Sequence, residues 1–574
     1  MRGFAALALA ALPLALADAG LRDHPIETAA APTYLDGSWT ASSGSPLNGA
    51  APINISVPAW VPGDLLTDLQ KAKVIPDPWL DITWLDNSSI WVDHQWTYAT
   101  HFSVESSAVL TDAAALQLVF DGVKMGATVR VNGHVVGVLR DQFLRYSFTL
   151  GSAAGLLPGP RTNRLEVTFA EDVAEDGRFM ACTGGWDWAP YSNTGTNSSN
   201  ATTGFANTLS KGLWKSVYLI TVPVATVAIT HLTPHTHYMG KYPTAPLEDG
   251  THGGFSVNVT AHVWVPVGGA KGRLSVGGSW AASQETAGAE MELAAGESKV
   301  SLQINATSAE IKLWWPTGVG AQPLYNVTAT WTPTSSAKTT TAVRRLGFRV
   351  FALVTINDTD AATVASNASA DGSGTHGMFF RVNGAAIYSR GANMVPMEEL
   401  EGRMSGTSHR ILVKSSADAG MNTLRVWGGG IFYPTEFYDS CDEYGVLVYH
   451  DMQYASTGGG PHGPLASKEQ DAELRHQIRR LSHHPAIILW DGANEVVVGP
   501  LDGCPVRTLH QHFCQSSFRN IAAFCLTLLL CSTRPRRAWA ACARPGREDL
   551  PVRSATPRDR PSVRHRRMSL LHSS

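Results

Sequence analysis

The chain has 574 residues, which is enough for several domains that each bury a hydrophobic core. Its formal net charge of −3 averages two unlike parts: residues 1–500 carry 32 basic and 44 acidic side chains, whereas residues 501–574 carry 13 arginines, no lysine and four acids. A mildly acidic body argues against nucleic acid as a partner. Only Cys182 and Cys441 precede residue 500, so we expect no disulfide framework.

Residues 1–17 are typical of a secretory signal peptide. Arg2 precedes a short apolar run that closes on Ala15-Leu16-Ala17, which predicts cleavage before Asp18. The run is too short to anchor the chain in a membrane. Nine Asn-x-Ser/Thr sequons follow, at Asn54, Asn87, Asn197, Asn200, Asn258, Asn305, Asn326, Asn357 and Asn367. We therefore expect a glycoprotein of the secretory pathway, either secreted or lysosomal/vacuolar, with no membrane partner.

Residues 18–222 predict a β-sandwich of the jelly-roll type. Apolar and polar residues alternate along 91–104 and 116–139, and further strands are expected at 165–169 and 216–220. Asn132-Gly133 lies between two β-branched runs, which is a strong hairpin pattern. Within this domain Trp186-Asp187-Trp188 forms an aromatic loop that could stack on a sugar and accept hydrogen bonds from its hydroxyls. The alternative is a loop that only covers the end of the sandwich.

Residues 223–350 predict a second β domain, of the length of an immunoglobulin-like sandwich. It contains no clustered titratable residues, so we interpret it as a spacer. Residues 359–375 are rich in Ala, Ser, Asp and Gly and predict an exposed loop.

From residue 378 onward the pattern changes to short strands that alternate with helices. A hairpin is expected about Asn383-Gly384, helices at 409–419, 435–444 and 468–483, and strands at 423–427, 446–449 and 486–490. These are four βα-type repeats of a parallel barrel, assigned to residues 351–499. Polar or aromatic residues follow each strand, where parallel folds collect their chemistry: Arg390, Asn393, Trp427, Asp451, Asn494 and Glu495.

The Asn494-Glu495 pair follows a continuous apolar run, 486–490. Such a pair can set a carboxylic acid at the mouth of a barrel, with an amide beside it to hold a substrate hydroxyl. The alternative is a buried strand that runs into a polar turn, because most carboxylates at strand ends have no catalytic role.

An ordered set of short motifs resembles the β-mannosidases of glycoside hydrolase family 2 over about residues 35–498. The motifs are Val61-Pro62-Gly63, Ile75-Pro76-Asp77-Pro78, Gly184-Gly185-Trp186-Asp187-Trp188, Gly212-Leu213-Trp214, Leu313-Trp314-Trp315-Pro316, Gln322-Pro323-Leu324-Tyr325, Arg390-Gly391-Ala392-Asn393, Arg425-Val426-Trp427-Gly428-Gly429-Gly430 and Asn494-Glu495. The family's layout is a jelly-roll domain, an immunoglobulin-like sandwich, a (β/α)₈ catalytic barrel and small β domains behind it.

The resemblance implies retaining hydrolysis of terminal, non-reducing β-D-mannose residues from oligosaccharides and glycoproteins, without a cofactor or a metal. Glu495 matches the acid/base, whose pKa must be raised by burial and by a second carboxylate. Asn494 matches the residue that holds the 2-hydroxyl. Asp187 and Trp427 match positions that line the sugar subsite, and the resemblance adds Trp186 and Arg390 as further substrate-binding candidates.

Two departures from the family pattern stand out. Met394 follows Gly391-Ala392-Asn393, where the family commonly has Trp. The nucleophile, a Glu at the end of the seventh barrel strand, has no counterpart, because the resemblance stops after four strands. Residues 500–574 carry five of the seven cysteines, without Cys-x₂-Cys spacing, and show no strand or helix period.

We therefore expect an incomplete barrel, an aberrant and disordered tail, and weak or no hydrolysis of β-mannosides. One alternative is a catalytically inactive, carbohydrate-binding or non-functional product of the same gene. Another alternative is an enzyme for galactose, glucuronate or glucosamine. The Trp186-Asp187-Trp188 loop and the strand from Arg425 to Trp427 argue against this second alternative.

Overall fold

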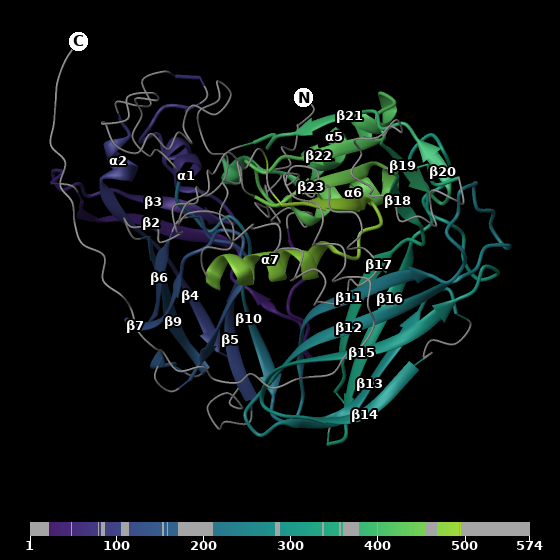
Figure 1. Cartoon of the computed structure of the whole chain (residues 1–574). Coiled ribbons are helices and arrows are strands. Elements are labelled where there is room, and N and C mark those ends of the chain that lie inside the picture. The colour runs from purple at the N-terminus through teal and green to yellow at the C-terminus, as the bar shows by residue number, and fades with distance from the viewer. Residues whose placement is uncertain are drawn as a thin grey trace, which may run out of the picture. The chain divides into compact units, whose positions relative to one another are not determined.

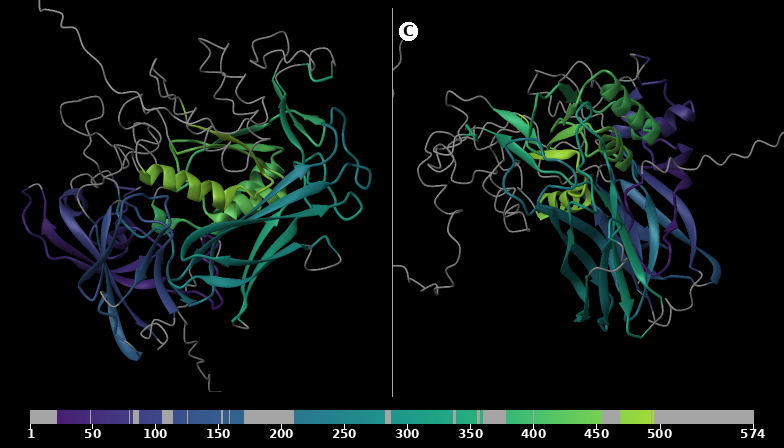
Figure 2. Two further views of the ribbon diagram at one scale, coloured as in Figure 1. Left: turned by 60° about the horizontal axis from the view of Figure 1, so that its bottom comes forward. Right: turned by 90° about the vertical axis from the view of Figure 1, so that its right-hand side faces the viewer.

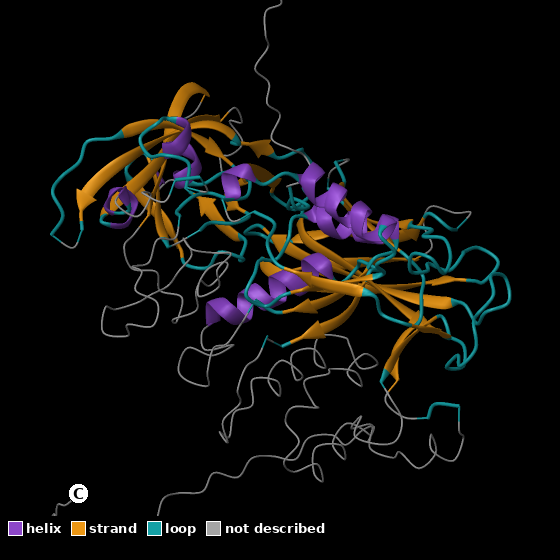
Figure 3. Cartoon of the chain, turned by 90° about the horizontal axis from the view of Figure 1, so that it is seen from above, coloured by secondary structure: helices purple, strands orange, loops and turns teal. Residues whose placement is uncertain are grey.

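The computed structural model is mostly β, with few helices among the residues it describes (Figures 1 and 3). The described residues are 22–47, 49–78, 80–81, 87–104, 114–124, 126–151, 154–157, 159–169, 210–281, 287–335, 338–354, 357–359, 378–398, 400–453, 468–492 and 494. The predicted signal peptide, the Trp186-Asp187-Trp188 loop, Glu495 and the tail lie outside them. None of the described helices is long and apolar enough to cross a lipid bilayer.

The first β-sandwich consists of two antiparallel sheets. The six-stranded sheet has the order β3-β2-β4-β9-β6-β7 and the four-stranded sheet the order β1-β10-β5-β8. The strands are β1 (Thr33–Tyr34), β2 (Gly37–Pro46), β3 (Ser56–Val61), β4 (His94–Val104), β5 (Ala114–Phe120), β6 (Ala127–Val131), β7 (His134–Leu139), β8 (Tyr146–Leu150), β9 (Gly159–Phe169) and β10 (Val217–Pro223). Two short helices accompany them, α1 (Leu65–Lys71) and α2 (Ser89–Val92).

Alternation along these strands explains why the two sheets pack together. In β3 every second side chain is buried, and the apolar faces of both sheets contribute to one core that includes Trp39, Trp96, Phe120 and Val217. The predicted hairpin is confirmed: β6 pairs with β7, and Asn132 and Gly133 adopt φ values of 50° and 83°, as a two-residue turn requires. Trp91 departs from the prediction, because it lies in α2 rather than in a strand.

The second β-sandwich follows directly, with its strands drawn in teal in Figure 2. One sheet has the order β11-β12-β15 and the other β14-β13-β16-β17. The strands are β11 (Ala228–Tyr238), β12 (Phe255–Val265), β13 (Ala270–Gly278), β14 (Ala287–Leu293), β15 (Gly296–Ala306), β16 (Tyr325–Pro333) and β17 (Thr340–Leu346). Their buried side chains form a separate core that includes Phe255, Val276 and Trp331.

The remaining elements form an antiparallel and a parallel sheet. The antiparallel sheet contains β18 (Phe351–Val354), β19 (Phe379–Val382) and β20 (Ala385–Ile387). The parallel sheet has the order β21-β22-β23-β24, made of β21 (Gly391–Met394), β22 (Thr423–Val426), β23 (Leu447–Asp451) and β24 (Ile487–Asp491). Its helices are α5 (Gly406–Asp418), α6 (Thr435–Tyr444) and α7 (Lys468–Leu481), and a 3₁₀ turn spans Glu401–Arg403.

The helix boundaries follow from local chemistry. Ser405 accepts a hydrogen bond from the Ser408 amide at the start of α5. Pro434 precedes α6, and Gly445 ends it with φ of 73°. One strand differs from the prediction. The segment that pairs in parallel with β22 is β21, whereas the preceding hairpin strand, β20, pairs antiparallel with β19.

A buried group of charges, the Asp23 cluster (Asp23, Lys215 and Arg480), ties the N-terminal segment to both β and α/β elements. Asp23 Oδ2 accepts from Lys215 Nζ at 2.7 Å, and its Oδ1 accepts from Arg480 of α7 at 2.9 Å and from Thr435 Oγ1 of α6 at 3.1 Å. The three charged side chains are at most 5% exposed. Burial opposes ionisation, yet Arg480 and Lys215 hold the pKa of Asp23 below its ordinary value.

Candidate active site

The carboxyl ends of β21 to β24 bring polar residues to one edge of the parallel sheet. Register places Asn393 beside Arg425, Arg425 beside Tyr449, and Asp451 beside Asp491. The four strands run in the same direction, so these positions share an edge. It is the edge at which open and closed parallel sheets place their ligands.

Arg425 connects the ends of all four strands. Its Nε and Nη2 donate to the two carboxylate oxygens of Asp451 at 3.2 and 2.6 Å. Its Nη1 donates to Asn393 Oδ1 at 3.1 Å, and Nη2 also donates to Asn494 Oδ1 at 2.9 Å. The planar guanidinium suits this because its donors point in fixed directions. We call Arg425, Asp451, Asn393 and Asn494 the strand-end cluster.

Asp451 is the buried acid of the strand-end cluster, with a side chain that is 0% exposed against 28% for Arg425. Burial raises the pKa of Asp451 to about 7, and the nearby charge of Asp491 raises it further, while Arg425 and the Gly428 amide oppose the shift. The Gly428 N–H donates to Asp451 Oδ2 at 3.0 Å. Asp451 therefore fixes both Arg425 and the glycine turn that follows β22.

Asn494 is buried, and Arg425 decides its orientation. Because its Oδ1 accepts from Arg425 Nη2, its amide nitrogen is the atom that can donate to another group. An amide donor held at a strand end can bind the oxygen of a sugar hydroxyl. Glu495 comes next in the chain and lies outside the described residues.

Trp427 is buried beneath the glycine turn, Gly428-Gly429-Gly430. Its amide donates to the Met394 carbonyl at 3.2 Å, and its own carbonyl accepts from the Gly430 amide at 3.1 Å. A Cβ at position 429 would lie 2.0 Å from Trp427 Cη2, so only glycine fits over the indole. Met394, which stands where the family commonly has Trp, is also buried.

A second acid follows on β24. The Tyr449 hydroxyl donates to Asp491 Oδ2, and Arg425 lies over the Tyr449 ring at 5.6 Å from its centroid. Burial, followed by the charge of Asp491, raises the pKa of Tyr449, which therefore stays a neutral donor.

Arg390 does not join the strand-end cluster. It lies one residue before β21, at the opposite end of the strand from Asn393, where its amide donates to Asn422 Oδ1 at 2.8 Å. Its side chain is exposed and lies near Gly318. Arg390 follows β20 as expected, but the strand that joins the parallel sheet, β21, begins after it, so Arg390 does not lie at the carboxyl edge of that sheet. Trp186, Asp187 and Glu495 lie outside the described residues, and their roles stay predictions.

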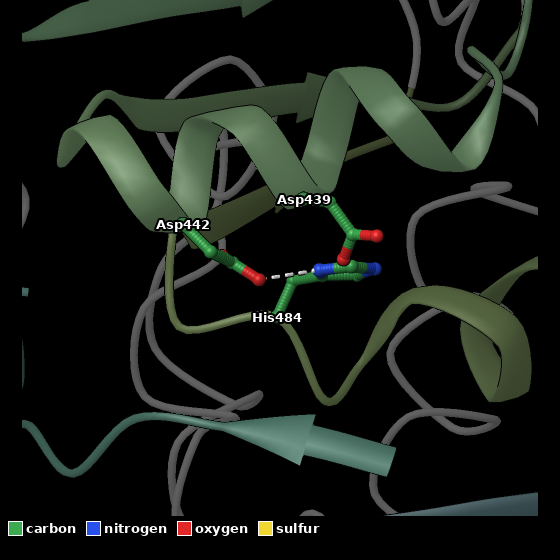
Figure 4. Close-up of side chains that lie close together, drawn as sticks. All are labelled: Asp439, Asp442 and His484. Atoms are coloured by element: carbon green, nitrogen blue, oxygen red, sulfur yellow. Dashed lines mark hydrogen bonds and ion pairs between the residues drawn. The ribbon is translucent and has the colours of Figure 1, made fainter. Parts of the chain in front are cut away.

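Elsewhere among the described residues, Asp439, Asp442 and His484 place possible metal-ligand atoms within 4.8 Å of one another (Figure 4). His484 Nδ1 and Asp442 Oδ2 form a 2.6 Å hydrogen bond, and Asp442 Oδ1 accepts from the Ala486 amide at 3.0 Å. Asp439 is paired with Arg345 at 3.1 Å. A cation here would compete with an arginine already in place, so we interpret the group as a hydrogen-bonded link between α6 and the segment before β24.

The chain is similar in sequence to known glycoside hydrolases. Residues 39–196 match the family described as glycosyl hydrolase 2 galactose-binding domain-like. A β-mannosidase from Rattus norvegicus is 28% identical over 497 residues, covering 81% of this chain and 50% of the relative. The resemblance to β-mannosidases of glycoside hydrolase family 2 is confirmed. β-Mannosidase A from Aspergillus aculeatus is 26% identical over 499 residues, covering 80% of this chain and 48% of the relative.

Among solved structures, the β-D-mannosidase from Dictyoglomus thermophilum has a similar fold. The TM-score is 0.60 at 21% identity, over 81% of this chain and 52% of that one. The chain thus spans about half the length of the β-mannosidases it matches.

Sequence reasoning named Asn393 and Asp451 as strand-end residues but gave them no role, and it treated Arg425 only as part of a motif. The missing signal was register. Once β21 to β24 are aligned in parallel, Arg425 is the long donor that can reach an acceptor on each neighbouring strand. Asp491 belongs to the same edge and could have been found in the same way.

Proposed function

We propose that the chain carries the acid/base half of an exo-acting, retaining β-mannosidase site, which acts on terminal non-reducing β-D-mannose residues of oligosaccharides and glycoproteins. The hydrogen bond from Arg425 to Asn494 Oδ1 carries the proposal, because it orients the residue directly before Glu495. Similarity to the β-mannosidases supports mannose as the sugar.

Glu495 is the proposed proton donor to the glycosidic oxygen. Retaining glycosidases also need a second carboxylate, about 5–5.5 Å from the first, which attacks the anomeric carbon. We assign no residue of this chain to that step. Asp451 is a poor substitute, because both of its oxygens accept from Arg425 and one also accepts from the Gly428 amide.

Asn494 is the proposed ligand of the 2-hydroxyl, through its amide nitrogen. In mannose this hydroxyl is axial, so an amide fixed at one angle can separate mannosides from glucosides. Trp427 would form one wall of the subsite. Trp186 and Asp187 would come from the first β-sandwich.

The order of the sheets along the chain supports the domain layout that we propose. Under the proposal, residues 18–222 are a jelly-roll domain, 223–350 an immunoglobulin-like sandwich, and 351–499 the first half of a (β/α)₈ barrel whose first four strands are β21 to β24. We further propose entry to the secretory pathway through residues 1–17 and glycosylation. Asn54, Asn305 and Asn326 are exposed sequon positions among the described residues.

A substrate with a good leaving group tests the proposal in the full chain. With 2,4-dinitrophenyl β-D-mannoside, azide can replace the missing carboxylate: it attacks C1 from the face opposite the leaving group, the C1–O bond breaks, and α-mannosyl azide and dinitrophenolate form. We expect slow turnover without azide and at least 10-fold faster release with it. The matching galactoside and glucuronide should show little release.

The Glu495→Gln variant isolates the acid/base. It should keep azide-dependent release from the dinitrophenyl mannoside, which needs no acid, and lose about 10²-fold or more on a phenyl mannoside, which does. Hydrolysis at an ordinary glycosidase rate without azide would contradict the missing nucleophile. Mannoside binding without any azide product would favour the inactive carbohydrate-binding alternative.

A further inference from the structure

Helix α7 packs against β11 of the second β-sandwich (Figure 1). Three imidazoles, from α7, from β11 and from its neighbour β12, gather at this contact. His231 lies on β11, His262 on β12 and His476 on α7. The ring centroids of His231 and His476 are 5.1 Å apart, and those of His231 and His262 are 6.1 Å apart. His476 is 5% exposed.

His231 and His476 are joined by a hydrogen bond of 2.9 Å between Nε2 of the first and Nδ1 of the second. One ring must donate and the other accept, so the bond exists only while at least one of them is neutral. Their outer nitrogens, His231 Nδ1 and His476 Nε2, are buried and have no hydrogen-bond partner within the described part of the chain. Whichever tautomers are present, one outer nitrogen is an unpaired acceptor that a proton could occupy.

The charges that face this pair are mostly positive. Arg479 and Arg480 come from α7, Arg145 from the segment before β8, and Lys215 from the segment before β10; Asp23 is the acid that faces His476. Asp23 already pairs with Lys215 and Arg480, and Arg145 pairs with Asp121 at 2.6 Å. A proton added to the imidazoles would therefore enter a buried region whose carboxylates are already engaged.

Helix α7 leads directly to the candidate site. It ends at Leu481, β24 begins at Ile487, and Asn494 follows. A movement of α7 away from the second β-sandwich would pull on β24, which carries Asp491 and precedes Asn494.

We propose that the neutral His231–His476 pair is an acid-sensitive latch, which docks α7 on the second β-sandwich at neutral pH and releases α7, together with the strand leading to Asn494, on acidification. The inference does not depend on which sugar, if any, the site binds.

Burial of the imidazoles explains why acidification weakens the latch. Burial and the neighbouring positive charges lower the pKa values of His231 and His476 well below 6.5, and that of His262 to about 3. Above pH 6.5 these rings are neutral in both folded and unfolded chains, so their packing stabilises the fold fully. As the pH falls below 6.5 the unfolded chain takes up protons first, and stability is lost toward the folded pKa values.

Hydrogen exchange of the full chain at pH 7.5 and pH 5.0, expressed as protection factors, tests release without any substitution. We expect protection of residues 468–481 to fall at least 10-fold at pH 5.0 relative to that of β16, which lies in the other sheet of the second β-sandwich. Equal changes in α7 and β16 would overturn the proposal.

Substitutions test the cause. His231→Gln with His476→Gln keeps a donor and an acceptor but cannot titrate. When the pH is lowered from 7 to 5, a histidine that stays neutral in the folded chain raises the unfolding equilibrium constant by about 20-fold. The double variant lacks two such histidines, so its unfolding equilibrium constant should rise several-hundred-fold less than that of the wild type. His101→Gln, at an exposed position on β4, is the control and should leave the pH dependence unchanged. An unaltered pH dependence in a folded double variant would also overturn the latch.

Discussion

The molecule contains two arginine–aspartate groups that look alike and behave differently: the Asp23 cluster and the strand-end cluster. Asp23 and Asp451 are both buried and both pair with arginine. The pKa of Asp23 lies below its ordinary value, because two cations outweigh the effect of burial. That of Asp451 rises to about 7, because burial and Asp491 outweigh a single arginine.

The difference shows how to separate a structural ion pair from a candidate site. All charged side chains of the Asp23 cluster are enclosed, and each Asp23 oxygen has a protein donor. In the strand-end cluster Arg425 is partly exposed. The amide nitrogen of Asn494 can still donate to another group, because Arg425 binds only its oxygen. The pKa of Asp451 is about 7. Similar residue types thus form a structural ion pair in the Asp23 cluster and a group that can titrate and bind a ligand in the strand-end cluster.

The largest effect is expected at Asp23. Asp23→Ala would leave Lys215 and Arg480 buried without their acid, which should lower the free energy of unfolding by about 3–5 kcal/mol. Urea denaturation at pH 7 measures it. Arg22→Ala is the matched control: Arg22 is 31% exposed where it pairs with Asp36, and its loss should cost about 1 kcal/mol or less. Equal losses in the two variants would remove the distinction between fully and partly enclosed pairs.

A smaller effect, with a definite pH dependence, is expected at Asp451. Because its folded pKa is about 7 against an ordinary value of 3.8, its contribution to stability is full below pH 3.8 and is lost as the pH rises through 7. Asp451→Asn should remove this loss, so that the variant gains about 3 kcal/mol relative to the wild type between pH 4 and pH 7. Urea denaturation across that range measures the gain, and a constant difference between the two proteins would contradict it.

Substitution of Arg425, the partner of Asp451, tests the same comparison between the two clusters. Arg425→Met removes the charge that opposes the shift, so the pKa of Asp451 should rise above 7, as followed by carboxyl-carbon NMR. Under the proposed function, the affinity for a mannoside should also fall about 10- to 100-fold, because Asn494 loses the donor that orients it. Arg425→Lys keeps the charge but not the fork of donors, so it should restore the Asp451 pKa and not the affinity.

The smallest effect is expected for an exposed pair on α5. Lys414 and Asp418 form an i,i+4 pair with side chains 54% and 65% exposed. Lys414→Ala should leave the melting temperature unchanged within measurement error, because water screens the pair and its geometry is easily lost. A clear loss would show that exposure is not what separates the clusters.

Local patterns predicted much of the fold. Asn-Gly pairs located the turns at Asn132 and Asn383, both with positive φ, and Pro434 and Gly445 bounded α6. Alternation located most strands of both β-sandwiches. The failures were local as well. Trp91 fits a strand pattern but lies in a helical turn. The strand before Arg390 was assigned to the parallel sheet, whereas the strand that joins this sheet, β21, begins after Arg390.

The candidate site was only partly predictable. Strand ends could be recognised one at a time, which gave Trp427 and Asn494. The partners within the strand-end cluster depend on which residues stand side by side in neighbouring strands, and hydropathy does not encode that. The His231–His476 contact and the Asp23 cluster join residues separated by hundreds of positions, so no local pattern announces them.

The Asp23 cluster also sets an order of events during synthesis. Its aspartate is among the first residues to leave the ribosome, and Arg480 follows 457 positions later. At a translation rate of roughly 5–20 residues per second, Arg480 is synthesised about half a minute to a minute and a half after Asp23. Both β-sandwiches can form in that interval, so the bond between Asp23 and Arg480 is made after them, as one of the last steps of assembly.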